Sequence, residues 1–144
     1  MNNVVNIINR KVRFEYQFID TYTAGIQLVG TEVKSIRNGK VSLVDTFCIF
    51  NNDELFLKNV NIPGDGIIYS HEPIRDRKLL LNKKEIKKLK KDLIDGLSIV
   101  PYRIFTNNRG LIKVEIVLAK GKKIYDKRES IKKREMEREI KKIR

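Results

Sequence analysis

The side chains best suited to chemistry in this 144-residue chain are cationic, and they gather in two stretches. Residues 75–91 hold nine Lys or Arg and two acids, and residues 119–144 hold twelve Lys or Arg and five acids. The net charge is +13, so the rest of the chain is nearly neutral. A neutral body with two basic stretches is typical of a polyanion-binding protein. We therefore expect nucleic acid as the partner, ahead of an anionic membrane.

The groups that catalysis or metal binding requires are few and isolated. His71 is the only histidine, and without a second imidazole or a nearby nucleophile we expect an ordinary surface or loop-packing histidine. Cys48 is the only cysteine, lies in an apolar stretch and is expected to be a buried, inert thiol. A two-metal nuclease centre would need at least two of Glu32, Asp45 and Asp53 to converge. Nucleotide-binding, zinc-protease and serine-hydrolase motifs are missing, so we expect no enzyme, metal or cofactor.

Three groups of cations are candidates for contact with a sugar-phosphate backbone. The first precedes Tyr16, whose phase favours core packing at least as much as base stacking, and the second precedes an apolar leucine triplet. The third surrounds Gly121, where a residue without a side chain could let the backbone approach RNA closely. No helix-turn-helix or zinc finger is visible, which favours structured RNA over DNA. The candidates are Asn9, Arg10, Lys11, Arg13 and Tyr16, then Arg75, Arg77 and Lys78, then Lys120, Gly121, Lys122 and Lys123.

Short strands are the main elements that must position these residues. Alternating apolar residues predict a strand over 12–20, and a second apolar stretch predicts one over 24–29. Residues 61–78 contain prolines and glycines with little periodicity, so we expect a loop there. Two hairpins are predicted from strands flanking turn residues, the first from 44–50 and 55–60 and the second from 99–106 and 111–118.

Two helices are predicted between these strands. The first covers 31–39, with Thr31 as N-cap and Gly39 at its end. The second begins after Asn82, where Glu85 completes a capping box, and its apolar residues face inward while its lysines face solvent.

The expected fold is mainly β with short helices: a small antiparallel OB-type barrel of about six strands, flanked by helices and followed by a basic C-terminal tail. We expect residues 1–8 to be a flexible N-terminus, 9–124 to form the RNA-binding barrel, and 125–144 to be a tail that is disordered alone. A single cysteine excludes a disulfide framework. No apolar run approaches the ~20 residues that span a bilayer, and no signal-peptide pattern is seen. We expect a cytoplasmic monomer.

Seven motifs in order carry a family resemblance: Asn9-Arg-Lys, Ala24-Gly25, Gly30-Thr-Glu-Val-Lys-Ser35, Arg37-Asn-Gly-Lys40, Arg77-Lys-Leu-Leu-Leu-Asn82, Ala119-Lys-Gly-Lys-Lys123 and Asp126-Lys-Arg128. From residue 9 to the end, the chain resembles the family of small protein B, the SsrA-binding proteins. The resemblance implies a non-enzymatic barrel that binds the tRNA-like domain of transfer-messenger RNA and delivers it to stalled ribosomes for trans-translation. The partners implied are transfer-messenger RNA, ribosomal RNA of the decoding site and messenger channel, and elongation factor Tu through the RNA.

The resemblance also assigns residues. The family's RNA-binding cluster falls on Asn9, Thr23, Ala24, Gly25 and Leu80, with Thr23 standing where the family usually has Glu. The tail is implied to occupy the empty messenger channel and to fold there as a helix. Arg144 stands where the family often has Met, so the tail end is expected to be short. The implied tail contacts are Asp126, Lys127, Arg128, Lys132, Lys133, Arg134, Arg138, Lys141, Lys142 and Ile143.

Two other functions fit parts of the pattern. A ribosomal protein or translation factor with a barrel body and a basic tail would have the same composition, and only the ordered motifs argue against it. An RNA-processing enzyme would need the nucleophile, metal cluster or second histidine that the sequence lacks.

Overall fold

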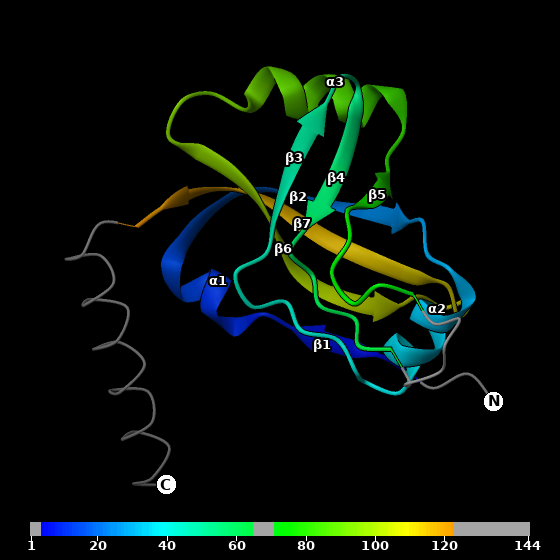
Figure 1. The fold of residues 1–144 in the computed structure, drawn as a ribbon. Coiled ribbons are helices and arrows are strands. Elements are labelled where there is room, and N and C mark those ends of the chain that lie inside the picture. The colour runs from blue at the N-terminus through cyan, green and yellow to red at the C-terminus, as the bar shows by residue number, and fades with distance from the viewer. Residues whose placement is uncertain (1–3, 65–70, 123–144) are drawn as a thin grey trace, which may run out of the picture.

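The computed structural model describes residues 4–64 and 71–122, and in this part the chain is mainly β, with a seven-stranded sheet and short helices (Figure 1). Lys123 and all candidate residues of the tail lie outside the described residues. The helices are α1 (Arg10–Glu15), α2 (Gly30–Arg37) and α3 (Lys83–Asp92). The strands are β1 (Asn6–Ile8), β2 (Tyr16–Ile26), β3 (Phe47–Asn51), β4 (Glu54–Lys58), β5 (Arg77–Leu80), β6 (Leu97–Thr106) and β7 (Ile112–Gly121).

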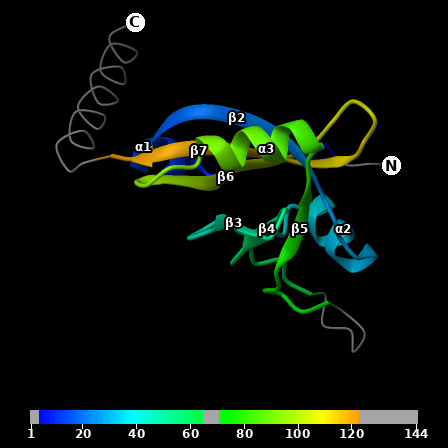
Figure 2. The ribbon, with the colours of Figure 1, turned by 90° about the horizontal axis from the view of Figure 1, so that it is seen from above.

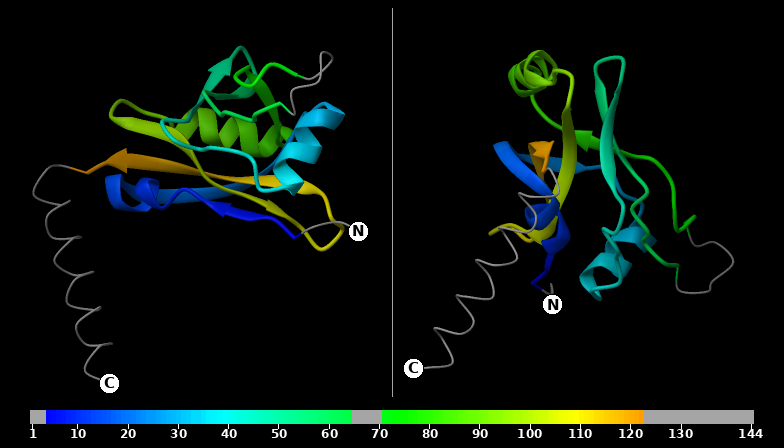
Figure 3. Two further views of the ribbon diagram at one scale, coloured as in Figure 1. Left: turned by 60° about the horizontal axis from the view of Figure 1, so that its bottom comes forward. Right: turned by 90° about the vertical axis from the view of Figure 1, so that its left-hand side faces the viewer.

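The strands pair antiparallel and close into a ring. The order is β6, β3, β4, β5, β2, β7, after which β7 pairs with β6 again, while β1 pairs with the end of β6. Figure 2 shows two walls, one of β2, β6 and β7 and the other of β3, β4 and β5, and the right-hand view of Figure 3 shows the same two walls from the side. The predicted small antiparallel barrel is therefore confirmed. Closure pairs the strand edges that an open sheet would expose.

Two apolar clusters hold the barrel together. The main core fills the interior, where Leu55, Ile116 and Leu118 are at most 1% exposed. A smaller cluster lies on the outer side of the β2–β7–β6 wall, where Val12 of α1 packs on Val117 and neighbouring side chains. Side chains alternate between the two sides of a strand, so the wall is apolar inside throughout and apolar outside only where α1 covers it.

The helix α3 begins as predicted. Asn82 Oδ1 accepts the Glu85 N–H at 2.8 Å, and Glu85 Oε1 accepts the Asn82 N–H at 3.1 Å, which completes the capping box. In Figure 1, α3 lies across the top of the barrel. Its Leu89 is fully buried, so the helix contributes to the core. Among the described residues, no helix is long and apolar enough to cross a membrane.

The helix α2 spans Gly30–Arg37 where 31–39 was predicted, and the main difference is its N-cap. It begins one residue early, with Val29 as N-cap in place of Thr31, because the Glu32 carboxylate accepts the Val29 N–H at 2.9 Å. Gly39 follows the helix with φ of +75°, the left-handed conformation that glycine adopts most readily, so the predicted end is confirmed.

The prediction for 12–20 was wrong in its first half. Val12 belongs to α1, not to a strand, and β2 starts at Tyr16 and continues into the second predicted strand, 24–29, where it ends at Ile26. The alternation of apolar residues predicted one strand because Val12, Tyr16 and Phe18 all face the same smaller cluster. Val12 reaches that cluster from a helix, and the other two reach it from a strand. The strand β1 was not predicted, and β5 includes the last residues of the predicted loop.

Both predicted hairpins are confirmed, with shifted ends. β3 and β4 pair from Phe47↔Lys58 to Asn51↔Glu54, which leaves a two-residue turn in which Asn52 has φ of +58°. In the turn between β6 and β7, the side chain of Asn107 accepts two backbone N–H groups. Asparagine suits both turns because it tolerates positive φ and bonds its own backbone.

Candidate nucleic-acid interface

One row of side chains crosses the outer side of the barrel from β5 to β1. In register, Leu80 pairs with Gly25, Gly25 with Lys113, Lys113 with Phe105, and Phe105 with Asn6. These residues point outward because their chain neighbours on β2, β7 and β6 are fully buried: Ala24, Val114 and Ile104. The row therefore joins five strands on one surface.

A second row runs beside the first. Thr23 pairs with Glu115, Glu115 with Arg103, and Arg103 with Ile8. We call the two rows together the open face; its members from β5, β2, β7 and β6 are Leu80, Thr23, Gly25, Lys113, Glu115, Arg103 and Phe105. The open face continues the outer surface of the wall that α1 covers at its other end.

Leu80 and Gly25 form the apolar end of the open face. Leu80 is 45% exposed although it lies in a strand. A Cβ at Gly25 would lie 3.2 Å from Leu80 Cβ and 3.7 Å from Lys113 Nζ, so glycine is what lets the leucine and the lysine approach each other here. The three residues border a depression of about 300 Å³. A ligand placed there would contact an apolar side chain, bare backbone and an ammonium group together.

Arg103 and Phe105 form the aromatic end. The guanidinium lies 4.0 Å from the centre of the Phe105 ring. Glu115 Oε2 accepts a hydrogen bond from Arg103 Nε at 2.5 Å, and Asn6 Oδ1 accepts one from Nη1 at 3.3 Å. These contacts fix the guanidinium plane before any ligand arrives. Such a plane can stack on an unpaired base or hold a phosphate.

The N-terminal cations belong to α1, which covers the other end of the same wall. The Arg13 guanidinium lies 5.0 Å from the Phe18 ring and 5.1 Å from the Tyr102 ring, and its Nε donates to Tyr102 Oη at 3.2 Å. Arg10 and Lys11 are exposed. Arg13 and the open face therefore lie toward opposite ends of β2 on the same outer side of the wall.

Two of the N-terminal candidates also serve the fold. The Asn9 side chain donates to the Leu43 carbonyl at 2.8 Å and its backbone N–H to the Tyr102 carbonyl at 2.7 Å. Tyr16 packs against the smaller apolar cluster. Of the two interpretations left open for Tyr16, core packing is the one that the structure supports.

Arg77 is placed where the sequence did not suggest. Its side chain is fully buried, and Nε donates to Glu32 Oε2 at 2.5 Å while Nη1 donates to the Val60 carbonyl at 2.8 Å. Arg75 also donates to Glu32, and its side chain is one-third exposed. As a surface contact for RNA, Arg77 is therefore corrected to a core residue. Lys78 is half-buried and pairs with Glu54 at 3.3 Å.

Glu32 is the anion that organises these arginines. Burial alone would raise the pKa of its carboxyl group. Hydrogen bonds from Arg75, from the Val29 N–H and from Arg77 outweigh burial and lower the pKa below its ordinary value of 4.5. The carboxylate is therefore ionised at neutral pH inside the protein.

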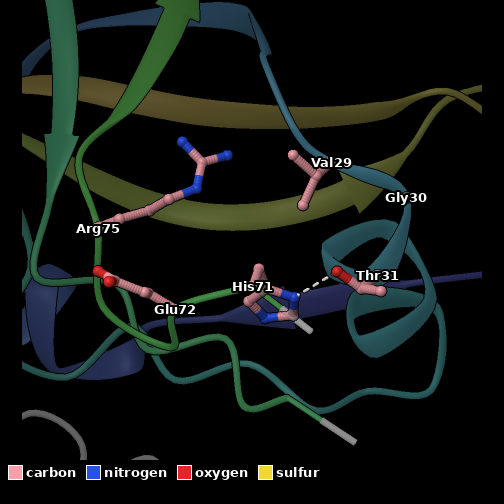
Figure 4. A pocket seen from close by; sticks show the side chains of 6 residues that line it. All are labelled: Val29, Gly30, Thr31, His71, Glu72 and Arg75. Carbon is pink, nitrogen blue, oxygen red and sulfur yellow. Dashed lines mark hydrogen bonds between the residues drawn. The ribbon is translucent and has the colours of Figure 1, made fainter. Parts of the chain in front are cut away.

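A second hollow, of about 530 Å³, lies beside this ion cluster (Figure 4). His71 lines it, with Nδ1 2.7 Å from Thr31 Oγ1 and Nε2 2.6 Å from the Ile62 carbonyl. Both ring nitrogens thus have partners within the fold, as expected for a loop-packing histidine. Cys48 is buried, also as expected, and burial raises the pKa of its thiol.

Further candidates lie on β2 and at the end of β7. Thr23 is exposed, Ala24 is fully buried, and Lys120 and Gly121 are exposed at the end of β7. A Cβ at Gly121 would meet no atom within 4 Å, so the protein itself does not require glycine there. Within 4–64 and 71–122, no group of three or more His, Cys, Asp or Glu could hold a metal ion.

Sequence reasoning missed four members of the open face: Lys113, Glu115, Arg103 and Phe105. In the predicted strand 111–118, Lys113 and Glu115 alternate with apolar residues, and this pattern indicates that both point away from the core. Nothing in the sequence, however, gives the register that sets them beside Gly25 and Arg103.

Comparisons with known proteins agree with this architecture. A family model described as SmpB protein matches residues 6–144. An SsrA-binding protein of Christiangramia forsetii is 51% identical over 99% of this chain and 93% of its own length, and one of Cytophaga hutchinsonii is 53% identical over 97% and 94%. A chain from a solved structure described as "tmRNA-SmpB: a journey to the center of the bacterial ribosome" is 43% identical, with a TM-score of 0.70, over 89% of this chain and 94% of its own length. The chain belongs to the SmpB family, whose members include the SsrA-binding proteins.

Proposed function

We propose that this chain binds the tRNA-like domain of transfer-messenger RNA through the open face and accompanies it to stalled ribosomes for trans-translation. The relatives named SsrA-binding protein and the similar chain from the tmRNA-SmpB structure support this partner. The activity is binding without catalysis, and it belongs in the cytoplasm with the ribosomes.

The observation that carries the proposal is the continuous row from Leu80 through Gly25 and Lys113 to Phe105. It combines apolar contact, close approach of the backbone, a cation and a ring beneath a guanidinium. Folded RNA is recognised mostly at unpaired loops, where bases stack on aromatic and Arg planes while cations hold the backbone. The row offers each of these contacts within one surface.

Leu80→Ala tests the proposal. Leu80 is 45% exposed, so RNA that covers the exposed part would bury on the order of half a leucine side chain, worth about 1–1.5 kcal/mol or roughly tenfold in affinity. We expect that loss for a fluorescent tRNA-like domain in anisotropy titrations, with little change in melting temperature. The control is Ile94→Ala, which removes an apolar side chain that is 66% exposed beyond the end of α3.

Two results would contradict the proposal. One is equal affinity of wild type and Leu80→Ala for the tRNA-like domain. The other is wild-type protein that binds the tRNA-like domain no more tightly than an unrelated hairpin of equal length at moderate salt.

The division between barrel and tail is part of the same proposal and follows from the resemblance. A chain that ends at Ile124 is expected to keep its affinity for the tRNA-like domain but to lose peptide tagging in a reconstituted translation reaction. If that truncation abolished RNA binding, the assignment of the RNA site to the barrel would be wrong.

A further inference from the structure

Five of the six lysines of α3 fall into two sets, with Lys83 at the start of the helix in neither. The first set attaches the helix to both walls of the barrel. Lys88 Nζ lies 2.6 Å from Asp20 Oδ2 on β2, and this hydrogen bond holds the pKa of Asp20 below its ordinary value. Lys90 Nζ lies 2.8 Å from Asp53 Oδ1 in the β3–β4 turn. Leu89 between them is fully buried. The helix is therefore fixed in place by its own side chains.

The second set faces solvent. Lys84, Lys87 and Lys91 follow at i, i+3 and i+7, on the side of α3 opposite Leu89, and all three are exposed. We call them the lysine stripe. It extends over about 10 Å of helix. None of the three has an acidic partner among the described residues.

The acids of α3 are engaged elsewhere. Glu85 caps the helix through Asn82, and Asp92 lies 3.9 Å from Lys88. Like charges three or four residues apart destabilise a helix by about 0.2–0.5 kcal/mol per pair. The stripe thus costs stability in the free protein, a cost that a bound polyanion would remove.

The chemistry of the stripe favours double-stranded RNA. No aromatic residue occurs in α3, so the stripe lacks the stacking groups on which single-stranded binding depends. It also lacks the large apolar groups with which an interfacial helix enters a membrane on the same face as its cations. A rigid row of ammonium groups fits the phosphate backbone of a duplex, which is read by charge and shape.

We propose that the lysine stripe of α3 is a binding track for the phosphate backbone of double-stranded RNA. It begins next to the open face, because Leu80 ends β5 and α3 starts three residues later at Lys83. The source of the duplex rests on the proposed function: it is either a helical arm of the RNA held by the open face or a helix of ribosomal RNA.

The test uses a plain RNA duplex of about 20 base pairs, without loops, in anisotropy titrations at several salt concentrations. Each phosphate contact contributes about 0.9 to the slope of log K against log salt for a duplex. We expect the full-length variant Lys84→Gln/Lys87→Gln/Lys91→Gln to lower the slope by about 2–3 and to melt no lower than wild type. The matched control removes three exposed cations elsewhere: Lys34→Gln/Lys40→Gln/Arg109→Gln.

Three outcomes would overturn the inference. In the first, the stripe variant keeps the wild-type slope. In the second, both triple variants lower the slope by the same amount, which would mean that only net charge matters. Stripe-dependent binding to vesicles of anionic phospholipid, with duplex binding unchanged, would assign the stripe to membranes instead.

Further arms identify the source and separate this inference from the proposed function. Stripe-dependent binding of the tRNA-like domain points to an arm of that RNA, and stripe-dependent binding of isolated small ribosomal subunits points to ribosomal RNA. Leu80→Ala should weaken the tRNA-like complex while leaving the plain duplex unaffected. If the protein bound the tRNA-like domain no more tightly than an unrelated hairpin, the proposed function would fail. The titrations with the plain duplex would still decide whether the lysine stripe binds double-stranded RNA.

Discussion

Replacing Arg77 by alanine is expected to unfold this protein more readily without removing an RNA contact. Its guanidinium is fully buried and donates to Glu32, to the Val60 carbonyl and to carbonyls of the loop before β5. Alanine would leave a buried carboxylate with Arg75 as its only arginine partner and would remove the hydrogen bonds that Arg77 donates to these carbonyls. Breaking a buried pair in this way costs about 3–5 kcal/mol, a large part of the roughly 5–15 kcal/mol that stabilises a typical domain.

Urea unfolding followed by circular dichroism measures this cost directly. A loss of about 3–5 kcal/mol corresponds to a fall of roughly 10 °C or more in melting temperature for a domain of this size. Arg75→Ala is the control, because its side chain is one-third exposed and should cost about 1 kcal/mol. RNA affinity is then measured at a temperature where each variant is folded. A variant Arg77→Ala that kept its stability but lost RNA affinity would refute the placement of Arg77 in the core.

Acid should weaken the fold through the same cluster. Hydrogen bonds lower the pKa of Glu32 below 4.5 in the folded protein. The contribution of ionised Glu32 to the free energy of unfolding is therefore complete above about pH 4.5 and is lost as the pH falls through the lower pKa of the folded state. Over that acid range, the urea midpoint should fall more in wild type than in Glu32→Gln. Gly25→Ala should cost about 1–3 kcal/mol and weaken RNA binding, because its Cβ would lie 3.2 Å from a Cβ of β5, whereas Gly30→Ala has open space and should cost less. Arg103→Gln and Phe105→Leu should each weaken binding of the tRNA-like domain about tenfold. The double variant should lose less affinity than the product of the two single losses, since the two side chains act as one stack.

The parts of the fold that were predictable depend on neighbours in sequence. The capping box of α3 needs only Asn82 and Glu85, three residues apart, and both hairpins need only their turns and flanking strands. The start of β2 was not predictable in this way. Val12 faces the smaller cluster from a helix, and its alternation with Tyr16 and Phe18 satisfies a strand pattern equally well.

The candidate site was less predictable because charge on a sequence does not reveal its partner. Arg77 lies in the sequence between two other cations, Arg75 and Lys78, and nothing nearby marks it as buried. Glu32, the acid with which it pairs in the core, is 45 positions away. Lys88 pairs with an acid on β2 and Lys90 with an acid in the β3–β4 turn, while Lys87 beside them pairs with neither. Only the folded arrangement separates cations that hold the barrel together from cations that remain available to RNA.

Thr23 offers a sharper test of how the open face uses charge. Thr23 is exposed and lies directly opposite Glu115, which is hydrogen-bonded to Arg103. Thr23→Glu would set two carboxylates side by side, which costs about 0.2–1 kcal/mol, and would let both compete for Arg103. We expect RNA affinity to fall by up to about fivefold, measured with the tRNA-like domain.

The variant Thr23→Glu/Glu115→Gln moves the carboxylate from β7 to β2 without changing the net charge relative to wild type. Position 23 lies on β2, and β7 separates this strand from Arg103 on β6, so the relocated carboxylate must reach across β7. The repulsion between two carboxylates is removed, and we expect affinity to return toward that of wild type. If Thr23→Glu alone bound RNA more tightly at unchanged stability, the carboxylate at 23 would be contacting RNA itself, and the coupling to Glu115 would be refuted. Recovery in the double variant would mean that this face needs one carboxylate to orient Arg103, whichever strand supplies it.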